Sequence, residues 1–215
     1  MNGTVIYTDY QSKGKGQRGN SWESEEGENI LISIILDTKF VEPTDFYDLT
    51  IITSLAIHDL LSDYLKKDIK IKWPNDLIYE SKKIGGILIE TYIRQNIIEW
   101  CILGVGLNIN QKKFRDENAI SLADICGQRF DREELTNLLL QKVEAKYFQL
   151  QKGDIKSLRK EYIANLYWKN EIHVFQSEGS YFSGRILNVE PAGKLRMETE
   201  NGERLFDFKE VKFIK

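Results

Sequence analysis

The sequence predicts an α+β fold, in which helices pack on a mixed β-sheet and a small all-β module follows at the C-terminal end. Three observations support this prediction. Nearly continuous apolar runs, over residues 29–36 and 97–107, are typical of strands covered on both faces. Two segments, 44–65 and 131–151, repeat apolar residues at three- and four-residue steps, as amphipathic helices do. After residue 168 the pattern changes to short alternating strands separated by turns.

Composition limits the classes of function. The 215 residues suffice for one main domain with a small appendage. A net charge of −3 argues against general nucleic-acid binding, which needs clustered Lys and Arg over a broad face. Cys101 and Cys126 lack metal-binding spacing, so we expect buried thiols in a reducing cytoplasm. We expect no membrane association, because no apolar run approaches the roughly 18 residues of a membrane span.

The main domain is expected over residues 1–168. Its strands should cover residues 4–10, 29–36, 69–73, 77–79, 84–93 and 97–107. Thr44 or Asp45 should cap a helix of about twenty residues. Asp131 and Glu134 form a capping box for a helix that runs through about Gln151, and a further helix is expected over about 154–167.

Residues 169–215 are expected to form a small β domain. Its strands should cover residues 172–176, 181–189, 194–200 and 204–214. Asn201 and Gly202 form the strongest hairpin signal of the chain. Because no flexible linker precedes residue 169, we expect the two domains to pack together.

The unusual chemistry of the chain is concentrated in the segment Gln11–Trp22. Three glycines recur within it: Gly14, Gly16 and Gly19. Glycines permit positive φ and close approach of backbone N–H groups to a ligand, and Lys15 and Arg18 add positive charge. The spacing matches the dinucleotide fingerprint, but that motif must open a helix, and here a strand follows, so we reject it. The loop favours a carboxylate or phosphate ligand, with a solvated hairpin loop as the alternative.

Glycines also interrupt two apolar strands, at Gly85, Gly86, Gly104 and Gly106. Each weakens its strand by roughly 0.5–1 kcal/mol relative to alanine, so a compensating reason is required. Close approach of something flat is one explanation, and tight backbone packing is the other.

Charged side chains stand at the ends of these strands. Lys72 and Asp76 flank a turn that contains Pro74, and Lys82 and Lys83 precede the first glycine pair. A lysine beside glycine-rich backbone suits a carboxylate that is becoming an acyl phosphate, and a nearby aspartate could orient or deprotonate an incoming amine. The alternative is that these lysines are solvated strand-end charges.

Taken in order, four segments closely resemble the signature segments of biotin protein ligases. They read DYQSKGKGQRGNSW at residues 9–22, KWPND at 72–76, KIGGILIE at 83–90 and LGVGLN at 103–108. The resemblance implies the class II synthetase-like biotin/lipoate ligase fold, with a C-terminal SH3-like β-barrel. It further implies that biotin and MgATP give biotinyl-5′-AMP and pyrophosphate, after which a lysine of a biotin carboxyl carrier protein attacks the mixed anhydride.

The same resemblance implies roles for individual residues. Lys83 would contact the biotin carboxylate and the α-phosphate, Asp76 would position the acceptor amine, Arg18 would act from the loop, and Asn108 would contact magnesium. The residues implied to bind biotin or the adenylate are Gln11, Gly14, Lys15, Gly16, Gln17, Gly19, Trp22, Lys72, Asn75, Gly85, Gly86, Val105 and Gly106.

Two departures from the family pattern stand out. Lys15 replaces an arginine, which keeps the charge but loses the bidentate fork. The family also has an opening segment with a Ser-Thr-Asn element that binds the biotin ureido group, and this chain starts after it, so we expect a truncation or a misassigned start. The DNA-binding domain of repressor-type members is also missing, so we expect no operator binding. A lipoate-protein ligase, a non-catalytic biotin-binding remnant and a homodimer stay open.

Overall fold

The computed structural model describes residues 2–214, and of Arg18 only the backbone. The elements follow the chain in the order β1 (Thr4–Tyr7), β2 (Ile30–Asp37), α1 (Tyr47–Ser62), β3 (Ile69–Lys72), β4 (Asp76–Tyr79), β5 (Lys82–Arg94), β6 (Ile97–Leu107), α2 (Leu122–Cys126), α3 (Arg132–Gln151), α4 (Ile155–Ala164), β7 (Ile172–Ser177), β8 (Ser180–Val189), β9 (Leu195–Thr199), β10 (Gly202–Phe206) and β11 (Lys212–Phe213). Most of the predicted elements are confirmed, but α2 was not predicted. Within residues 2–214 no helix is long and apolar enough to cross a bilayer.

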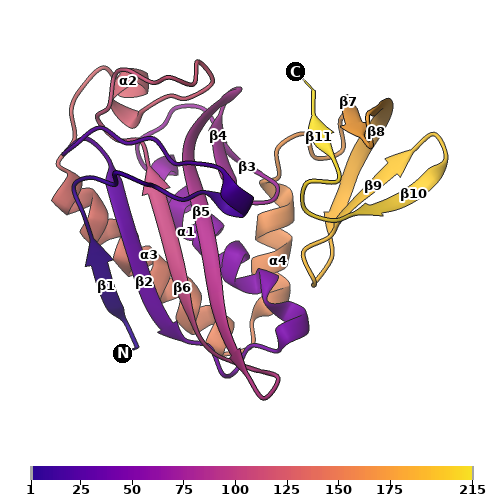
Figure 1. The fold of residues 1–215 in the computed structure, drawn as a ribbon, viewed down its shortest axis with the longest axis horizontal. Helices are drawn as coiled ribbons and strands as arrows, with labels where there is room; N and C mark the ends of the chain where they lie inside the picture. The colour runs from indigo at the N-terminus through magenta and orange to yellow at the C-terminus, as the bar shows by residue number, and fades with distance from the viewer. Residues whose placement is uncertain (1, 215) are drawn as a thin grey trace.

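The main sheet has six strands in the order β1-β2-β6-β5-β4-β3 (Figure 1). All its ladders are antiparallel, so the predicted mixed sheet is wrong in this respect. Short turns join β3 to β4, β4 to β5 and β5 to β6, and such connections permit only antiparallel neighbours. Gln95 and Asn96 both adopt positive φ in the β5–β6 turn, at the predicted hairpin.

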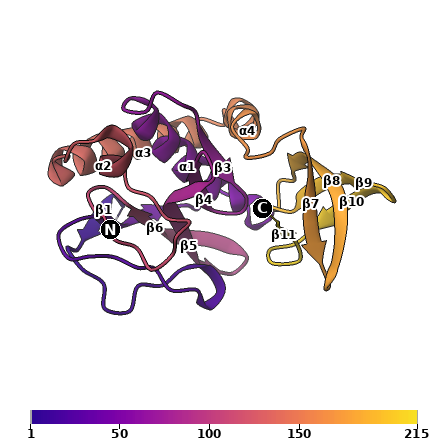
Figure 2. The same cartoon turned by 90° about the horizontal axis from the view of Figure 1, so that it is seen from above.

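The core lies between this sheet and the helices α1 and α3, which cover one of its faces (Figure 2). Alternate residues of β2, such as Ile32 and Ile34, are buried toward the helices. The residues of α1 are buried almost all round the helix, because it packs against α3, α4 and the strands β3 to β5. Cys101 is also buried here, which raises its pKa to about 12, as expected for a structural thiol.

The start of α1 corrects one prediction. Neither Thr44 nor Asp45 caps the helix; the segment Pro43–Asp45 forms a 3-10 turn, and α1 follows Phe46 without a side-chain cap. The carboxylate of Asp45 is used elsewhere, since it pairs with Arg159 of α4 at 2.8 Å.

The C-terminal strands form a second, five-stranded antiparallel sheet in the order β10-β9-β8-β7-β11. Among residues 2–214, the edge strands β10 and β11 do not pair with each other, so the sheet does not close into a barrel. The strand predicted over 204–214 is divided in two, because a turn at residues 207–210, with Lys209 at positive φ, separates β10 from β11.

The two sheets pack together at the turn after β3. Trp73 Nε1 donates a hydrogen bond of 2.8 Å to the carbonyl of Gly193 in the β8–β9 turn. The ring of Phe208 lies 5.4 Å from the Trp73 ring and 6.0 Å from the Tyr47 ring, measured between centroids. A Cβ at Gly193, whose φ is +85°, would lie 2.6 Å from Tyr47 Cδ2, so this contact requires glycine. The C-terminal sheet therefore supports the turn that leads into β4.

Candidate active site

A cavity of about 960 Å³ lies between the Gln11–Trp22 loop, the main sheet and the C-terminal segment. Twelve of the predicted site residues line it: Gln11, Lys15, Gly16, Gln17, Trp22, Lys72, Asn75, Asp76, Lys83, Gly86, Val105 and Gly106. Segments far apart in the sequence thus converge on one place. Gly14, Gly19, Gly85 and Asn108 do not line the cavity. The side chain of Arg18 lies outside the described part of the chain.

Five lining residues form one row across five strands of the main sheet. Strand register pairs Lys72 with Asp76, Asp76 with Gly86, Gly86 with Gly106 and Gly106 with Leu31. The row therefore runs from the edge strand β3 to β2, with a cation at one end, a carboxylate next to it and apolar or backbone surface beyond.

The central charged pair of the site is formed by Lys83 and Asp76. Lys83 Nζ lies 2.7 Å from Asp76 Oδ1, and the two side chains are 33% and 25% exposed. A register shift in the β4–β5 ladder, between Leu77 and Ile78, alters the pairing between the strands that carry them. A partly exposed ammonium beside a carboxylate can bind an anion, and the carboxylate can accept a proton from an amine.

The turn that presents Asp76 is held by hydrogen bonds on both sides. Asn75 Nδ2 donates to the carbonyl of Ile87 at 2.6 Å, and Ile87 N donates back to the Asn75 carbonyl at 3.0 Å. Tyr47 Oη donates to the Pro74 carbonyl at 2.8 Å. Burial raises the pKa of Tyr47 well above its usual range, so it keeps the proton that it donates. Sequence reasoning missed Tyr47, which reads there as an ordinary core position.

The segment Gln11–Trp22, here called the glycine-basic loop, folds into a small hairpin. Trp22 N donates to the Gly14 carbonyl at 2.9 Å, Gly16 N donates to the Asn20 carbonyl at 2.7 Å, and a 3-10 turn over Gln17–Gly19 closes the tip. Of its three glycines, only Gly19 adopts positive φ. Gly14 is needed for a different reason, since a Cβ there would lie 2.5 Å from the Trp22 carbonyl oxygen.

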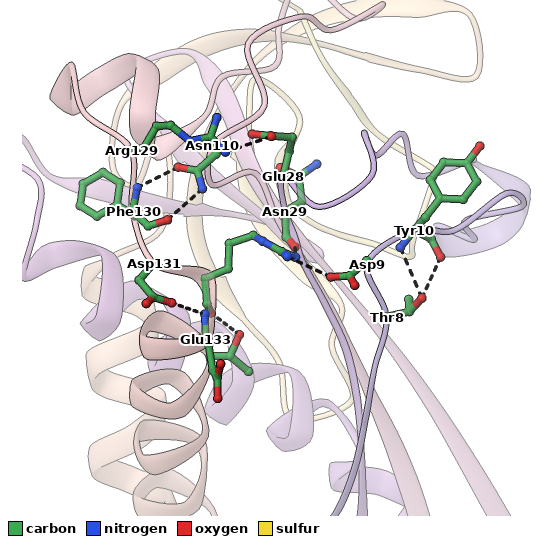
Figure 3. Close-up of polar contacts among 12 residues, drawn as sticks. Thr8, Asp9, Tyr10, Glu28, Asn29, Asn110, Arg129, Phe130, Asp131 and Glu133 are labelled. Carbon is green, nitrogen blue, oxygen red and sulfur yellow. Dashed lines mark hydrogen bonds and ion pairs between the residues drawn. The ribbon is translucent and has the colours of Figure 1, made fainter.

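The base of this loop is tied to the segment that leads into α3 (Figure 3). Arg132 Nη2 lies 2.9 Å from Asp9 Oδ1, and its Nη1 donates to the Asn29 carbonyl at 3.2 Å. Arg129 pairs with Glu28 at 3.0 Å. The chain just before the loop, at Asp9, and the chain just before β2, at Glu28 and Asn29, are thus held to one neighbour, while the tip of the loop lines the cavity.

The flat group that approaches the strand glycines is the indole of Trp22. A Cβ at Gly106 would lie 2.5 Å from Trp22 Cε2, and a Cβ at Gly86 would lie 3.1 Å from Trp22 Cζ3. Lys83 Nζ lies 5.3 Å from the centre of the indole ring. A Cβ at Gly104 would lie 3.1 Å from the Leu88 carbonyl oxygen, so tight backbone packing explains this glycine, whereas a Cβ at Gly85 would lie 2.4 Å from the side-chain atom Cδ2 of Leu107.

Asn108 serves the scaffold rather than the cavity surface. It is 3% exposed, its Nδ2 donates to the Ile120 carbonyl at 3.2 Å, and its backbone N donates to Ile84. Among residues 2–214, no group of three or more His, Cys, Asp or Glu side chains is arranged to hold a metal ion.

Several lining residues had no individual role assigned from the sequence: Tyr10, Lys13 and Glu90, which lie within the signature segments, and Lys209, Lys212 and Phe213, which lie outside them. The last three come from the β10–β11 turn and β11, more than a hundred residues from Lys83. No local pattern marks them, because packing of the second sheet on the first brings them to the cavity.

Comparisons with known proteins agree with this geometry. The Biotin/lipoate A/B protein ligase family matches residues 1–108. The chain is 28% identical over 93% of its length to the bifunctional ligase/repressor BirA of Bacillus subtilis, and it spans 63% of that protein. It is 33% identical over 80% of its length to biotin–protein ligase 2 of Arabidopsis thaliana, and it spans 52% of that relative.

The fold is also similar to that of a solved biotin protein ligase. A biotin protein ligase from Aquifex aeolicus, solved in complex with biotin and ATP, superposes with a TM-score of 0.83 at 24% identity. The superposition covers all of this chain and 90% of that one. Since the family match covers half of the chain, the protein belongs to the Biotin/lipoate A/B protein ligase family.

Proposed function

We propose that this protein is an ATP-dependent ligase, which forms biotinyl-5′-AMP and transfers biotin to a lysine of a biotin carboxyl carrier protein. Relatives named as biotin–protein ligases and a similar structure that holds biotin and ATP support this assignment. The observation that carries it is the pairing of Lys83 and Asp76 at 2.7 Å in a cavity covered by the glycine-basic loop.

In the first step, the carboxylate of biotin attacks the α-phosphorus of ATP, and pyrophosphate leaves with the bonding electrons. Charge grows on the phosphate oxygens in the transition state, and the Lys83 ammonium is placed to stabilise it. The apolar part of the cavity, with Leu31, Ile102 and Val105, suits the ring and chain of biotin.

In the second step, a lysine amine of the carrier attacks the mixed anhydride and AMP leaves. The amine must lose a proton to become a stable amide, and Asp76 is the carboxylate placed to accept it. Its separation from Lys83 must then increase, because the ammonium turns to the adenylate.

Magnesium fits this site only together with the nucleotide. Mg²⁺ is commonly bound through one or two carboxylates and the phosphates of a substrate. Asp76 and Glu90 are the carboxylates that line the described cavity. When bound, the ion would supply charge neutralisation at the phosphates. Because Asn108 is 3% exposed and does not line the cavity, the role implied for Asn108 toward magnesium has no support in the geometry.

The direct test is incubation with labelled biotin, MgATP and a biotin carboxyl carrier domain, alongside a carrier whose acceptor lysine is replaced by arginine. We expect label on the first carrier and none on the second. No label on either, with no pyrophosphate released, would contradict the proposal.

Two alternatives have distinct outcomes in the same assay. The family name covers lipoate ligases, and greater pyrophosphate release with lipoate than with biotin would assign that substrate. A biotin-binding remnant would bind biotin in calorimetry, unaffected by ATP, and release no pyrophosphate.

We further propose that residues 1–168 are the ligase domain and that residues 169–215 are an SH3-like domain, which the five-stranded antiparallel sheet supports. Two free cysteines and the use of ATP support a cytoplasmic location.

A further inference from the structure

A pair of buried tyrosines lies behind the turn that presents Asp76. Tyr47 of α1 and Tyr162 of α4 are 1% and 0% exposed, and their hydroxyl oxygens lie 2.8 Å apart. Tyr47 Oη also lies 2.8 Å from the carbonyl oxygen of Pro74, which lines the cavity. Neither hydroxyl takes part in the two chemical steps, so the pair requires another explanation.

The two hydrogen bonds run in one direction, from α4 to the cavity wall. A carbonyl oxygen only accepts, and a tyrosine hydroxyl has one proton to donate, so Tyr47 donates to Pro74. Tyr162 must therefore donate to Tyr47. Burial raises the pKa of both tyrosines, so both hydroxyls keep their protons at neutral pH. In a low-dielectric interior such bonds polarise one another, and the bond from Tyr162 strengthens the one to Pro74.

Helix α4 is itself fixed against its neighbours. Arg159, one turn before Tyr162, makes two hydrogen bonds of 2.9 Å with the carboxylate of Asp48 in α1. Just after α4, the carbonyl of Asn165 accepts a hydrogen bond of 2.9 Å from Ile71 N in β3. Tyr162 is thus held relative to both α1 and the strand that leads into the turn, so it provides a fixed point behind residues 74–76.

The position of this turn decides where the charged pair lies. Asp76 faces Lys83 Nζ of β5 at 2.7 Å and pairs in register with Lys72 of β3. Asn75 ties the turn to β5, and the tyrosine pair holds it separately at Pro74. A general base must lie within hydrogen-bond distance of the proton that it accepts, and a displacement of about 1 Å can slow a reaction about a hundredfold.

We propose that Tyr162 and Tyr47 are positioning residues, which hold residues 74–76 so that the Asp76 carboxylate meets the acceptor amine in the second step. This inference rests on the proposed ligase activity. In that step the amine nitrogen bonds to the carbonyl carbon of biotin, and the bond from that carbon to the phosphate oxygen breaks. AMP leaves with the electron pair, and the proton of the amine passes to Asp76.

The test compares Tyr47→Phe and Tyr162→Phe, which remove the hydroxyls and keep the rings. Tyr147→Phe is the matched control. Tyr147 is a buried tyrosine of α3, its Oη donates to the Asp37 carbonyl at 2.7 Å, and it does not line the cavity. Each variant thus loses a buried hydrogen bond from a hydroxyl, but only the first two lose it behind the turn.

Four quantities separate the two half-reactions from stability. They are the urea midpoint of unfolding, the rate of biotin-dependent pyrophosphate exchange, the KM for the carrier domain, and the rate of transfer from preformed biotinyl-5′-AMP between about pH 7.5 and about pH 9.5. Amide hydrogen exchange of residues 75–77 reports on the turn directly.

We expect Tyr47→Phe to slow transfer about tenfold at about pH 7.5, with the KM for the carrier changed by less than about twofold, because one hydrogen bond to the turn is lost. Tyr162→Phe should slow transfer about threefold, since Tyr47 keeps its bond to Pro74 and loses only the polarising donor. Both deficits should shrink toward about pH 9.5. There more of the acceptor amine, whose pKa is about 10.4, has already lost the proton that Asp76 accepts.

Pyrophosphate exchange should fall by less than transfer, and the amides of residues 75–77 should exchange faster. Tyr147→Phe should lower the urea midpoint by a similar amount and leave transfer and its pH profile unchanged. Unchanged transfer in both turn variants would overturn the inference, as would an equal loss in Tyr147→Phe or a deficit that is independent of pH.

Failure of the proposed function is distinguishable from failure of this inference. If the function fails, the unsubstituted chain itself transfers no biotin to the carrier, while hydrogen exchange still reports whether the two hydroxyls hold the turn. If only the inference fails, the unsubstituted chain stays active and the turn variants match it.

Discussion

Lys83 Nζ lies 2.7 Å from Asp76 Oδ1, although the two residues come from different strands of a ladder with a register shift. The contact places the one lysine and the one carboxylate that sequence reasoning had assigned to catalysis within hydrogen-bond distance. In the absence of substrate the charges of Lys83 and Asp76 neutralise each other, so neither partly buried side chain carries an uncompensated charge.

Lys83→Ala tests the role of the ammonium. We expect adenylate formation to slow by about a hundredfold or more, while biotin binding weakens by less than about tenfold, because the charge that Lys83 opposes grows in the transition state. Single-turnover formation of biotinyl-5′-AMP and the Kd for biotin measure the two effects. Lys82→Ala is the matched control, since Lys82 is exposed and does not line the cavity. Equal losses in both quantities would contradict this role.

Gly106→Ala tests whether the indole of Trp22 can pack on β6 only when residue 106 has no side chain. The added Cβ would lie 2.5 Å from Trp22 Cε2, so the ring must move away. We expect a red shift of Trp22 emission, measured as the difference from a Trp22→Phe background, and faster dissociation of the adenylate. Gly104→Ala is the control, because its Cβ would meet Leu88 rather than Trp22. The same red shift in both variants would refute a specific contact.

Gly193→Ala tests the support of the active-site turn by the C-terminal sheet. Gly193 and Gly179 have φ values of +85° and +82°, but only at Gly193 would a Cβ collide with a neighbour, Tyr47 Cδ2 at 2.6 Å. Gly179→Ala should therefore lower the free energy of unfolding by about 1 kcal/mol through backbone strain alone.

Gly193→Ala should cost about 1–3 kcal/mol more, because a collision in a packed contact adds to the strain. Urea unfolding of both variants measures the difference. The adenylation rate of Gly193→Ala should also fall. Tyr47, which the added Cβ would displace, donates a hydrogen bond to the Pro74 carbonyl in the turn that presents Asp76. Equal costs at the two glycines would mean that the sheets do not support each other through this contact.

Asp59→Asn tests an ion pair that ties α1 to α3. Burial alone would raise the pKa of Asp59, but the neighbouring His58 ring and Lys146, whose Nζ lies 3.1 Å from Asp59 Oδ2, outweigh it and lower the pKa from its usual value. The ionised form therefore stabilises the fold above pH 4, and this contribution is lost as the pH falls through the lowered value. We expect the variant to be less stable at pH 7 by up to about 1 kcal/mol and the difference to shrink below pH 4. A difference that persists unchanged at pH 3 would exclude the charge as its cause.

The elements that could be predicted are those with local causes. The β5–β6 hairpin follows from two apolar runs joined at Gln95 and Asn96, and the start of α3 follows from Asp131, whose side chain accepts from Glu133 N and Glu134 N. The five-residue helix α2 was missed because it is too short to show a periodic pattern. The end of the last predicted strand was misjudged, since Lys209 turns the chain at a positive φ that lysine rarely adopts.

The site shows the same limit. Residues within the signature segments, such as Lys83, Asp76 and Trp22, could be named, because each segment carries its own unusual composition. Which of these residues meet depends on strand register. The contact of the Trp22 indole with Gly106 joins the loop to β6, and the spacing of residues in the sequence does not predict it. Lys212 could not be found at all, because only the packing of the two sheets brings it to the cavity.

The most direct test of the account is a crystal structure of the chain with biotin and ATP bound. We expect the activated carboxyl or its phosphate within about 3.5 Å of Lys83 Nζ, beneath the Gln11–Trp22 loop. An adenylate bound elsewhere, touching neither Lys83 nor the loop, would contradict the claim that the loop and the sheet converge on one reacting group.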